Sequence, residues 1–288
     1  MNKNHTSKII LLLKIAAISV FIGRAWQFIF WDAPYRTLLW DQKWMEGIVN
    51  TFFSMSWQEY ATHPNVDNII NKIIFSTGIL YLITALLIPF YQKNRKWIFW
   101  IIIFSTTNLL LLFLLYMKER FFHVGQFFEH SAQLSSPVLL TLLIRQKVTV
   151  ERLKRLINIV VALTFICHGL YAIGFYPRPG VYVDLLINTF GVKESFAHTF
   201  ILIAGILDIV VAILIFFPKI SFYLLGYMMV WGFATAFARV IANVYADFFL
   251  QSLHQNIHLF VYRIPHGLLP LIGMILIRPS FLSRKKSI

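Results

Sequence analysis

Polar and ionisable side chains occur inside long apolar segments of this sequence. Such groups are costly in hydrocarbon, so they normally face the interior of a helix bundle or a wet cavity, and each is a candidate for a site. Arginine forks suit carboxylates, phosphates and polarised carbonyls, and histidine exchanges protons near neutral pH. The candidate set therefore predicts an outward-facing cationic pocket for a quinone-like or anionic ligand. Its members are Arg24, Glu129, His130, Gln133, His168, Arg239, Asn243, Arg263 and His266.

Eight polar residues are predicted to lie at one depth: Arg24, Asn108, Glu129, His130, His168, Arg239, Arg263 and His266. Counted from the outer end of each apolar segment, they fall roughly 10–13 Å below the surface at 1.5 Å per helical residue. The charges in this layer are Arg24, Arg239 and Arg263 against Glu129, which leaves two positive charges without a partner. Asp208 is deeper and is a candidate partner for one arginine. The alternative is a satisfied network that only fixes the helices and binds nothing.

Motifs for metal binding, thiol redox chemistry and hydrolysis are weak or absent in the sequence. His254 and His258 have the spacing of two helical metal ligands, but Gln255 stands where a zinc protease has its glutamate base, and no third ligand is evident. We therefore predict no metal site. Cys167 is the only cysteine, which excludes dithiol redox chemistry. The sequence contains no P-loop, GxSxG or dinucleotide fingerprint.

The segments that position these residues are membrane spans. The chain has 288 residues, 58% hydrophobic and 13% charged, with a mean hydropathy of +0.70. This composition excludes a disordered chain, a secreted disulfide scaffold and, despite a net charge of +14, a nucleic-acid binder. Runs of about 20 apolar residues predict eight transmembrane helices in an all-α polytopic protein. They are 9–31, 69–91, 97–117, 121–144, 157–176, 196–217, 220–245 and 257–277.

The basic residues predict the orientation. The side that holds both termini carries 15 basic residues, including Lys285 and Lys286, and one acid, whereas the other side carries 7 basic residues and nine acids. Both termini are therefore expected to be cytoplasmic, with contact to anionic lipid of the bilayer. A bacterial inner membrane is the expected location. The basic and apolar start of the chain could be a cleaved signal peptide, but Arg24 and the segment 26–31 continue it, which favours an uncleaved first span.

Two halves of the chain resemble each other. Residues 78–90 (GILYLITALLIPF) and 205–217 (GILDIVVAILIFF) match at seven of thirteen positions. Each half also leaves the membrane at an aromatic-proline corner, WDAP (31–34) or YPRP (176–179), and closes with a span that contains Pro137 or Pro270. We predict two tandem four-helix units, 1–150 and 151–288. The long external loop 32–67 is expected to hold an interfacial helix that anchors the protein or covers a ligand.

The segments GRAWQFIFWDAPYR (23–36) and ICHGLYAIGFYPRPG (166–180) give the chain a resemblance to the DoxX-like membrane superfamily, although His168 and Gly169 replace the arginine in the second. This resemblance implies a small membrane subunit that serves a redox or envelope partner and binds a quinone. A fainter resemblance is to the membrane domain of vitamin-K-dependent-carboxylase-like proteins, whose large extramembrane domain has no counterpart here. The alternatives are a small-anion transporter, which would need an inward route through apolar cytoplasmic halves, and a structural or assembly factor.

Overall fold

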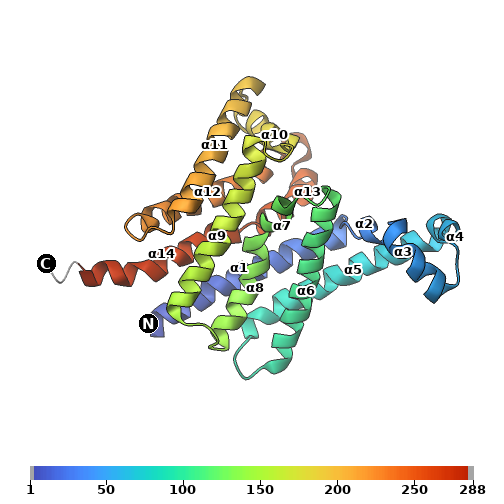
Figure 1. Ribbon diagram of the computed structural model, residues 1–288, viewed down its shortest axis with the longest axis horizontal. Coiled ribbons are helices and arrows are strands. Elements are labelled where there is room, and N and C mark those ends of the chain that lie inside the picture. The colour runs from blue at the N-terminus through green and yellow to red at the C-terminus, as the bar shows by residue number, and fades with distance from the viewer. Residues whose placement is uncertain (1–2, 285–288) are drawn as a thin grey trace.

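A computed structural model describes residues 3–284, and Lys285 and Lys286 of the charge count lie outside them. This part of the chain is all-helical and contains no strand (Figure 1). Seven of the helical segments described are long and apolar enough to cross a membrane, as expected of a multi-pass membrane protein. The elements are α1 (Lys3–Phe30), α2 (Arg36–Leu39), α3 (Gln42–Ile48), η1 (Val49–Phe53), α4 (Trp57–Thr62), α5 (Pro64–Leu87), η2 (Ile88–Phe90), α6 (Lys96–Glu119), α7 (Val124–Phe128), α8 (Ser131–Ile144), α9 (Val150–Ile173), α10 (Gly180–Phe190), α11 (Glu194–Leu214), α12 (Ser221–Ile241), η3 (Ala246–Phe248), α13 (Phe249–Val261) and α14 (Pro265–Arg284).

The expected fourth span, 121–144, is not one helix. It is divided into α7 and α8, which meet at Glu129 and His130, and α8 alone is too short to count among the seven long helices. The His130 Nδ1 atom lies 2.8 Å from the Gln126 carbonyl oxygen, so a side chain supplies the hydrogen bond that a continuous helix would make through its backbone. The hydrogen bond between the His130 side chain and the Gln126 carbonyl oxygen thus stabilises the break.

The last expected span, 257–277, is also interrupted. The helix α13 ends at Val261 and α14 begins at Pro265, with Tyr262, Arg263 and Ile264 between them. A proline in the first turn of a helix has no amide hydrogen to leave unpaired, but it cannot continue a preceding helix. Pro265 therefore sets the start of α14, and the polar side chains between α13 and α14 are free to contact neighbouring helices.

Glycines allow the closest helix pairs. A Cβ atom on Gly78 of α5 would lie 2.8 Å from Ile29 of α1, and a Cβ atom on Gly205 of α11 would lie 2.7 Å from Ala172 of α9. On Gly232 of α12 it would lie 2.5 Å from the His266 carbonyl oxygen of α14. Small residues at these points permit near backbone contact. The helix α11 consequently packs mainly on α9 and α12 mainly on α14, so α11 and α12 diverge from their short connection (Figure 1).

The external segment between α1 and α5 is helical, as expected for 32–67, and contains α2, α3, η1 and α4. Arg36 forms ion pairs with Asp32 and Asp67, and Lys118 at the end of α6 pairs with Asp41. The corresponding segment of the second half is the single helix α10. It is bounded by Pro179 and by a left-handed glycine, Gly191 (φ +64°), which ends it.

Candidate functional site

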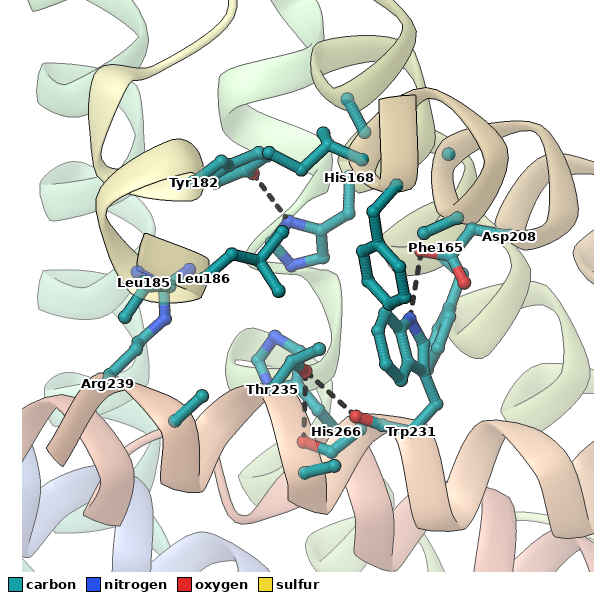
Figure 2. Close-up of a pocket in the computed structure, with 18 of the residues that line it drawn as sticks. Phe165, His168, Tyr182, Leu185, Leu186, Asp208, Trp231, Thr235, Arg239 and His266 are labelled. Atoms are coloured by element: carbon teal, nitrogen blue, oxygen red, sulfur yellow. Dashed lines mark hydrogen bonds between the residues drawn. The ribbon is translucent and has the colours of Figure 1, made fainter. Parts of the chain in front are cut away.

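A cavity of about 250 Å³ lies between α9, α11, α12 and α14, with α10 across one side. Four of the nine candidate residues line it: His168, Arg239, Arg263 and His266. The other walls are mainly apolar side chains, including Phe165, Leu185, Leu186, Phe190, Phe200, Ile201 and Trp231. Figure 2 shows Arg239 and Asp208 on opposite sides of this space. The cavity is thus an apolar chamber with polar groups at its two ends.

The cationic end of the cavity has two arginines. The buried Nε atom of Arg239 has no hydrogen-bond partner. Arg263 donates from Nη1 to the Leu259 carbonyl oxygen at 3.0 Å, and its guanidinium carbon lies 4.7 Å from the centre of the Tyr262 ring. Within the described part of the chain, neither guanidinium forms an ion pair. An incoming acceptor oxygen would find two positively charged forks whose charge no carboxylate neutralises by contact.

Two histidines lie beside the arginines. The His168 Nδ1 atom lies 3.3 Å from the Tyr182 hydroxyl and 3.6 Å from Glu129 Oε2. The His266 ring lies 5.6 Å from the His168 ring, and its Nδ1 atom lies 3.0 Å from the Arg263 carbonyl oxygen. Because a carbonyl only accepts, His266 Nδ1 must carry the hydrogen, which leaves Nε2 as the acceptor of the neutral ring. His266 can therefore take a proton from a bound hydroxyl group.

Asp208 defines the opposite end. Its Oδ2 atom accepts from the Trp231 indole nitrogen at 3.3 Å, whereas its buried Oδ1 atom has no partner. The expectation that Asp208 pairs with an arginine is wrong, because Asp208 of α11 contacts Trp231 and forms no ion pair with an arginine of the described residues. Trp231 and Arg239 are eight residues apart on α12, or about 12 Å at 1.5 Å per residue. The Asp208 carboxylate and the two arginines therefore lie at opposite ends of the cavity, far enough apart for the polar head and part of the tail of a small ligand to lie between them.

Arg24 belongs to a different network. Its Nη2 and Nη1 atoms donate to Gln133 Oε1 at 2.6 Å and to Gln27 Oε1 at 2.7 Å. Its guanidinium carbon lies 3.8 Å from the centre of the Tyr262 ring, and Tyr116 accepts a longer bond of 3.4 Å. Arg24 is 1% exposed and does not line the cavity. It is a satisfied structural cation.

The break in the fourth span separates residues that the sequence placed on one face. Glu129 turns towards His168 of α9, and Gln133 turns towards Arg24. The His130 ring instead stacks on Phe113 of α6, with ring centres 4.5 Å apart. None of these three lines the cavity. Glu129 still touches it indirectly, through its contact with the cavity histidine.

Asn243 also lies outside the cavity. It follows the end of α12, where its Nδ2 atom donates to the Arg239 carbonyl oxygen at 2.9 Å. Its own carbonyl oxygen accepts from Asn256 of α13. Asn243 therefore satisfies the end of the helix that carries Arg239, and it positions that residue without facing the cavity.

Some residues of the Arg24 network and of the cavity were missed from the sequence. Gln27 follows Arg24 by three residues, so the two side chains share one face of a helix, and this spacing could have indicated their contact. Tyr182 and Trp231 carry no such signal, because aromatic residues are frequent throughout this chain and only the fold shows which ones meet a cavity. The helix α10 that brings Tyr182 there was expected only as part of an external loop.

The weaker metal candidate has another role in the structure. The His254 ring packs against Trp26 and Trp31, and Trp26 donates to the His254 carbonyl oxygen. Among the residues that the structure describes, no three His, Cys, Asp or Glu side chains converge as metal ligands would.

Comparison with protein-family models, with curated proteins and with solved structures finds no match. The fold thus defines a class, an all-helical protein with several membrane-spanning helices, and function must be argued from the site.

Proposed function

We propose that this protein is a DoxX-like membrane subunit whose cavity binds a polarised or anionic ligand, such as a quinone, for a redox or envelope partner. The observation that carries the proposal is the pair Arg239 and Arg263, two cations without an ion pair at one end of an apolar cavity. Both residues are partly buried, and the buried Arg239 Nε atom has no partner, so a ligand that supplies oxygen acceptors would be stabilised there. The arginines would polarise the ligand oxygens, and His266 Nε2 would exchange a proton with them.

The proposal includes eight crossings in two four-helix units, 1–150 and 151–288, with α7 and α8 together forming the fourth crossing. The close pairs support it. Gly78 lies against Phe28, and Gly205 lies against Ala172. A shift of 127 residues along the sequence relates the two glycines, and a shift of 144 residues relates their two neighbours. The first two long helices of each half therefore meet at corresponding residues.

The broken helices support the same arrangement. A shift of 133 residues relates Pro137 to Pro270 and carries the end of α7 onto the end of α13. Arg24 of α1 contacts Gln133 of its own half and Tyr262 in the break of the other half.

His168 makes the related contacts. The shift of 144 residues relates His168 to Arg24. The shift of 133 residues relates His266 to Gln133 and Tyr262 to Glu129. His168 lies beside His266 of its own half and beside Glu129 in the break of the other half. Two networks thus share one pattern of contacts, and His168 and His266 of the second network line the cavity.

A small-anion transporter is the second candidate. Discontinuous helices at corresponding positions of two repeats are typical of transporter binding sites, and α7–α8 and α13–α14 have this form. This candidate requires uptake of an anion such as phosphate or acetate into vesicles that contain the purified protein. The absence of such uptake, together with a retained hydrophobic ligand, favours the subunit.

The test is mass spectrometry of small molecules that co-purify in native lipid particles. Wild type is compared with Arg239→Ala and Arg263→Ala. We expect a quinone or a defined anion in wild type and its loss from both variants, each still monodisperse and folded. Recovery of bulk phospholipid alone from all three would leave a structural or assembly role as the better account.

Orientation is tested separately. With the native Cys167 replaced by serine, single cysteines at Thr62 and Gln146 report opposite sides of the bilayer. A membrane-impermeant maleimide applied to intact cells should label position 62 and spare position 146 until the cells are lysed. Labelling of position 146 in intact cells would reverse the proposed cytoplasmic location of the termini.

A further inference from the structure

The cavity has a side opening between two membrane helices. Because α11 packs on α9 and α12 packs on α14, the cavity extends into the gap between α11 and α12. Its rim there includes Phe200 of α11, which is 38% exposed, and Ala234 of α12, which is also exposed. Both helices are among the candidate spans, so this exposure faces hydrocarbon in a membrane.

The other approach is more covered. The helix α10 lies along the cavity, and its Tyr182, Leu185 and Leu186 form part of the wall (Figure 2). Tyr182 is held there by its contact with His168. A water-soluble ion would have to pass these apolar side chains, whereas a molecule dissolved in the bilayer meets a gap between α11 and α12.

The volume gives a second reason. At about 250 Å³ the cavity is smaller than the roughly 300–1,000 Å³ of sites that enclose a drug-sized ligand. It can enclose a head group and the first part of a tail, so the rest of a larger ligand must lie outside. The exposed Phe200 and the small Ala234 mark the place where a tail could leave into the hydrocarbon.

We infer that the ligand is a single-tailed amphipath that enters sideways from the bilayer between α11 and α12, with its oxygen-bearing head at Arg239 and Arg263 and its tail passing Phe200 and Ala234. This inference rests on the proposed ligand-binding function and adds its ligand class and route. A carboxylate and a quinone head share the required acceptor oxygens.

The test uses two photoreactive probes in lipid nanodiscs containing the purified full chain. One is a long-chain carboxylic acid with a diazirine near the end of its chain, and the other is a prenylated benzoquinone with the same group in its tail. We expect the preferred probe to label α11 or α12 near Phe200 and Ala234. Which probe labels the protein distinguishes the two head groups, and labelling confined to α10 or to the external loops would overturn the side route.

Variants separate the route from the site. Ala234→Trp fills the rim and should reduce labelling at least tenfold, while Val230→Trp, one turn earlier at a position that is 62% exposed and outside the cavity, should leave it unchanged. Arg239→Gln should also lose labelling, because the head group loses its partner. If Arg239→Gln abolishes labelling and Ala234→Trp does not, the side route is wrong and the binding site stands. Labelling that none of these substitutions changes would overturn both proposals.

Discussion

Two arginines within the apolar helices of this chain, the buried Arg24 and the partly buried Arg239, differ in what surrounds them. Arg24 gives its hydrogen bonds to glutamine oxygens and stacks on Tyr262, so its charge is dispersed over satisfied neighbours. Arg239 has a buried donor without a partner and faces an apolar space. Residue type is identical in the two cases, and only the environment separates a structural cation from a candidate ligand-binding one.

This contrast predicts opposite effects on stability. Arg24→Met removes the donors from two buried amide oxygens, each at a cost of about 1–3 kcal/mol, so we expect a loss of about 2–6 kcal/mol. Arg239→Gln removes a partly buried charge that has no ion pair and a buried Nε donor that has no partner, so it should raise the melting temperature in ligand-free detergent. Thermal unfolding followed by tryptophan fluorescence measures both. Equal destabilisation by the two substitutions would show that Arg239 is structural as well.

At this scale the sequence was informative about which residues are polar within the spans and much less about where they point. Helical spacing placed Glu129, His130 and Gln133 on one face, but the break after α7 turns them towards three different helices. A single-residue change in backbone direction rotates every later side chain, and no periodicity records it in advance.

Two helical segments, α7–α8 and α13–α14, are each interrupted by a polar turn, and this is the main feature at the scale of elements. The long apolar helices were predictable because their length must match the hydrocarbon thickness. The break after α7 was not, since Pro137 lies within α8 and no proline stands at the break. In both breaks a histidine side chain forms a hydrogen bond to a backbone oxygen, His130 to Gln126 and His266 to Arg263.

Helix contacts through glycine give the second prediction. Gly78→Ala and Gly205→Ala each place a methyl group within 2.8 Å of a neighbouring helix. We expect each to destabilise the protein by about 1–3 kcal/mol through overpacking. Gly47→Ala in α3 is the control, because no atom lies within 4 Å of its added Cβ, and it should be neutral or slightly stabilising. A neutral Gly205→Ala would mean that α9 and α11 are less closely packed than the structure has them.

The external helices give a pH-dependent prediction. The hydrogen bond from Lys118 lowers the pKa of the Asp41 carboxyl below 3.8, and the Ser56 backbone and hydroxyl lower the pKa of Glu59 below 4.5. A lowered folded-state pKa means that stabilisation is complete above the unfolded-state value and is lost as the pH falls through the folded-state value. The segment 41–62 should therefore lose amide protection between about pH 5 and about pH 2.

Hydrogen exchange, corrected for the intrinsic effect of pH, measures this loss. In Lys118→Met the pairing with Asp41 is absent at every pH, so α3 should be less protected already at pH 7 and should respond less to acid. The α4 segment, capped by Ser56 and Glu59, should respond as in wild type. An unchanged response of α3 in Lys118→Met would assign its stability to other contacts.

For the whole molecule, the proposed repeat directs attention to one difference between the two halves. If the halves are repeats, Ala172 and Asp208 at the cavity correspond to Phe28 and Tyr81, by the shifts of 144 and 127 residues. Phe28 and Tyr81 pack edge to face with ring centres 5.2 Å apart and are fully buried. On the proposed repeat, the first half would fill with aromatic rings the space that corresponds to the cavity of the second half.

This difference predicts that the cavity can be closed without damage to the fold. In the double variant Ala172→Phe and Asp208→Tyr, the new rings should occupy the cavity as Phe28 and Tyr81 do in the first half, and the unpaired Asp208 oxygen disappears. We expect stability equal to or above that of wild type and at least a tenfold loss of the co-purifying ligand.

Ala162→Phe is the matched control, because Ala162 is a buried alanine of the same helix that packs in the closed core. Overpacking there should cost about 1–3 kcal/mol. The stability of the double variant relative to Ala162→Phe shows whether Ala172 borders an open cavity or a closely packed core. If the double variant is as unstable as Ala162→Phe, no fillable space is present there. If it is stable and keeps its ligand, the ligand binds elsewhere and Arg239 and Arg263 need another explanation.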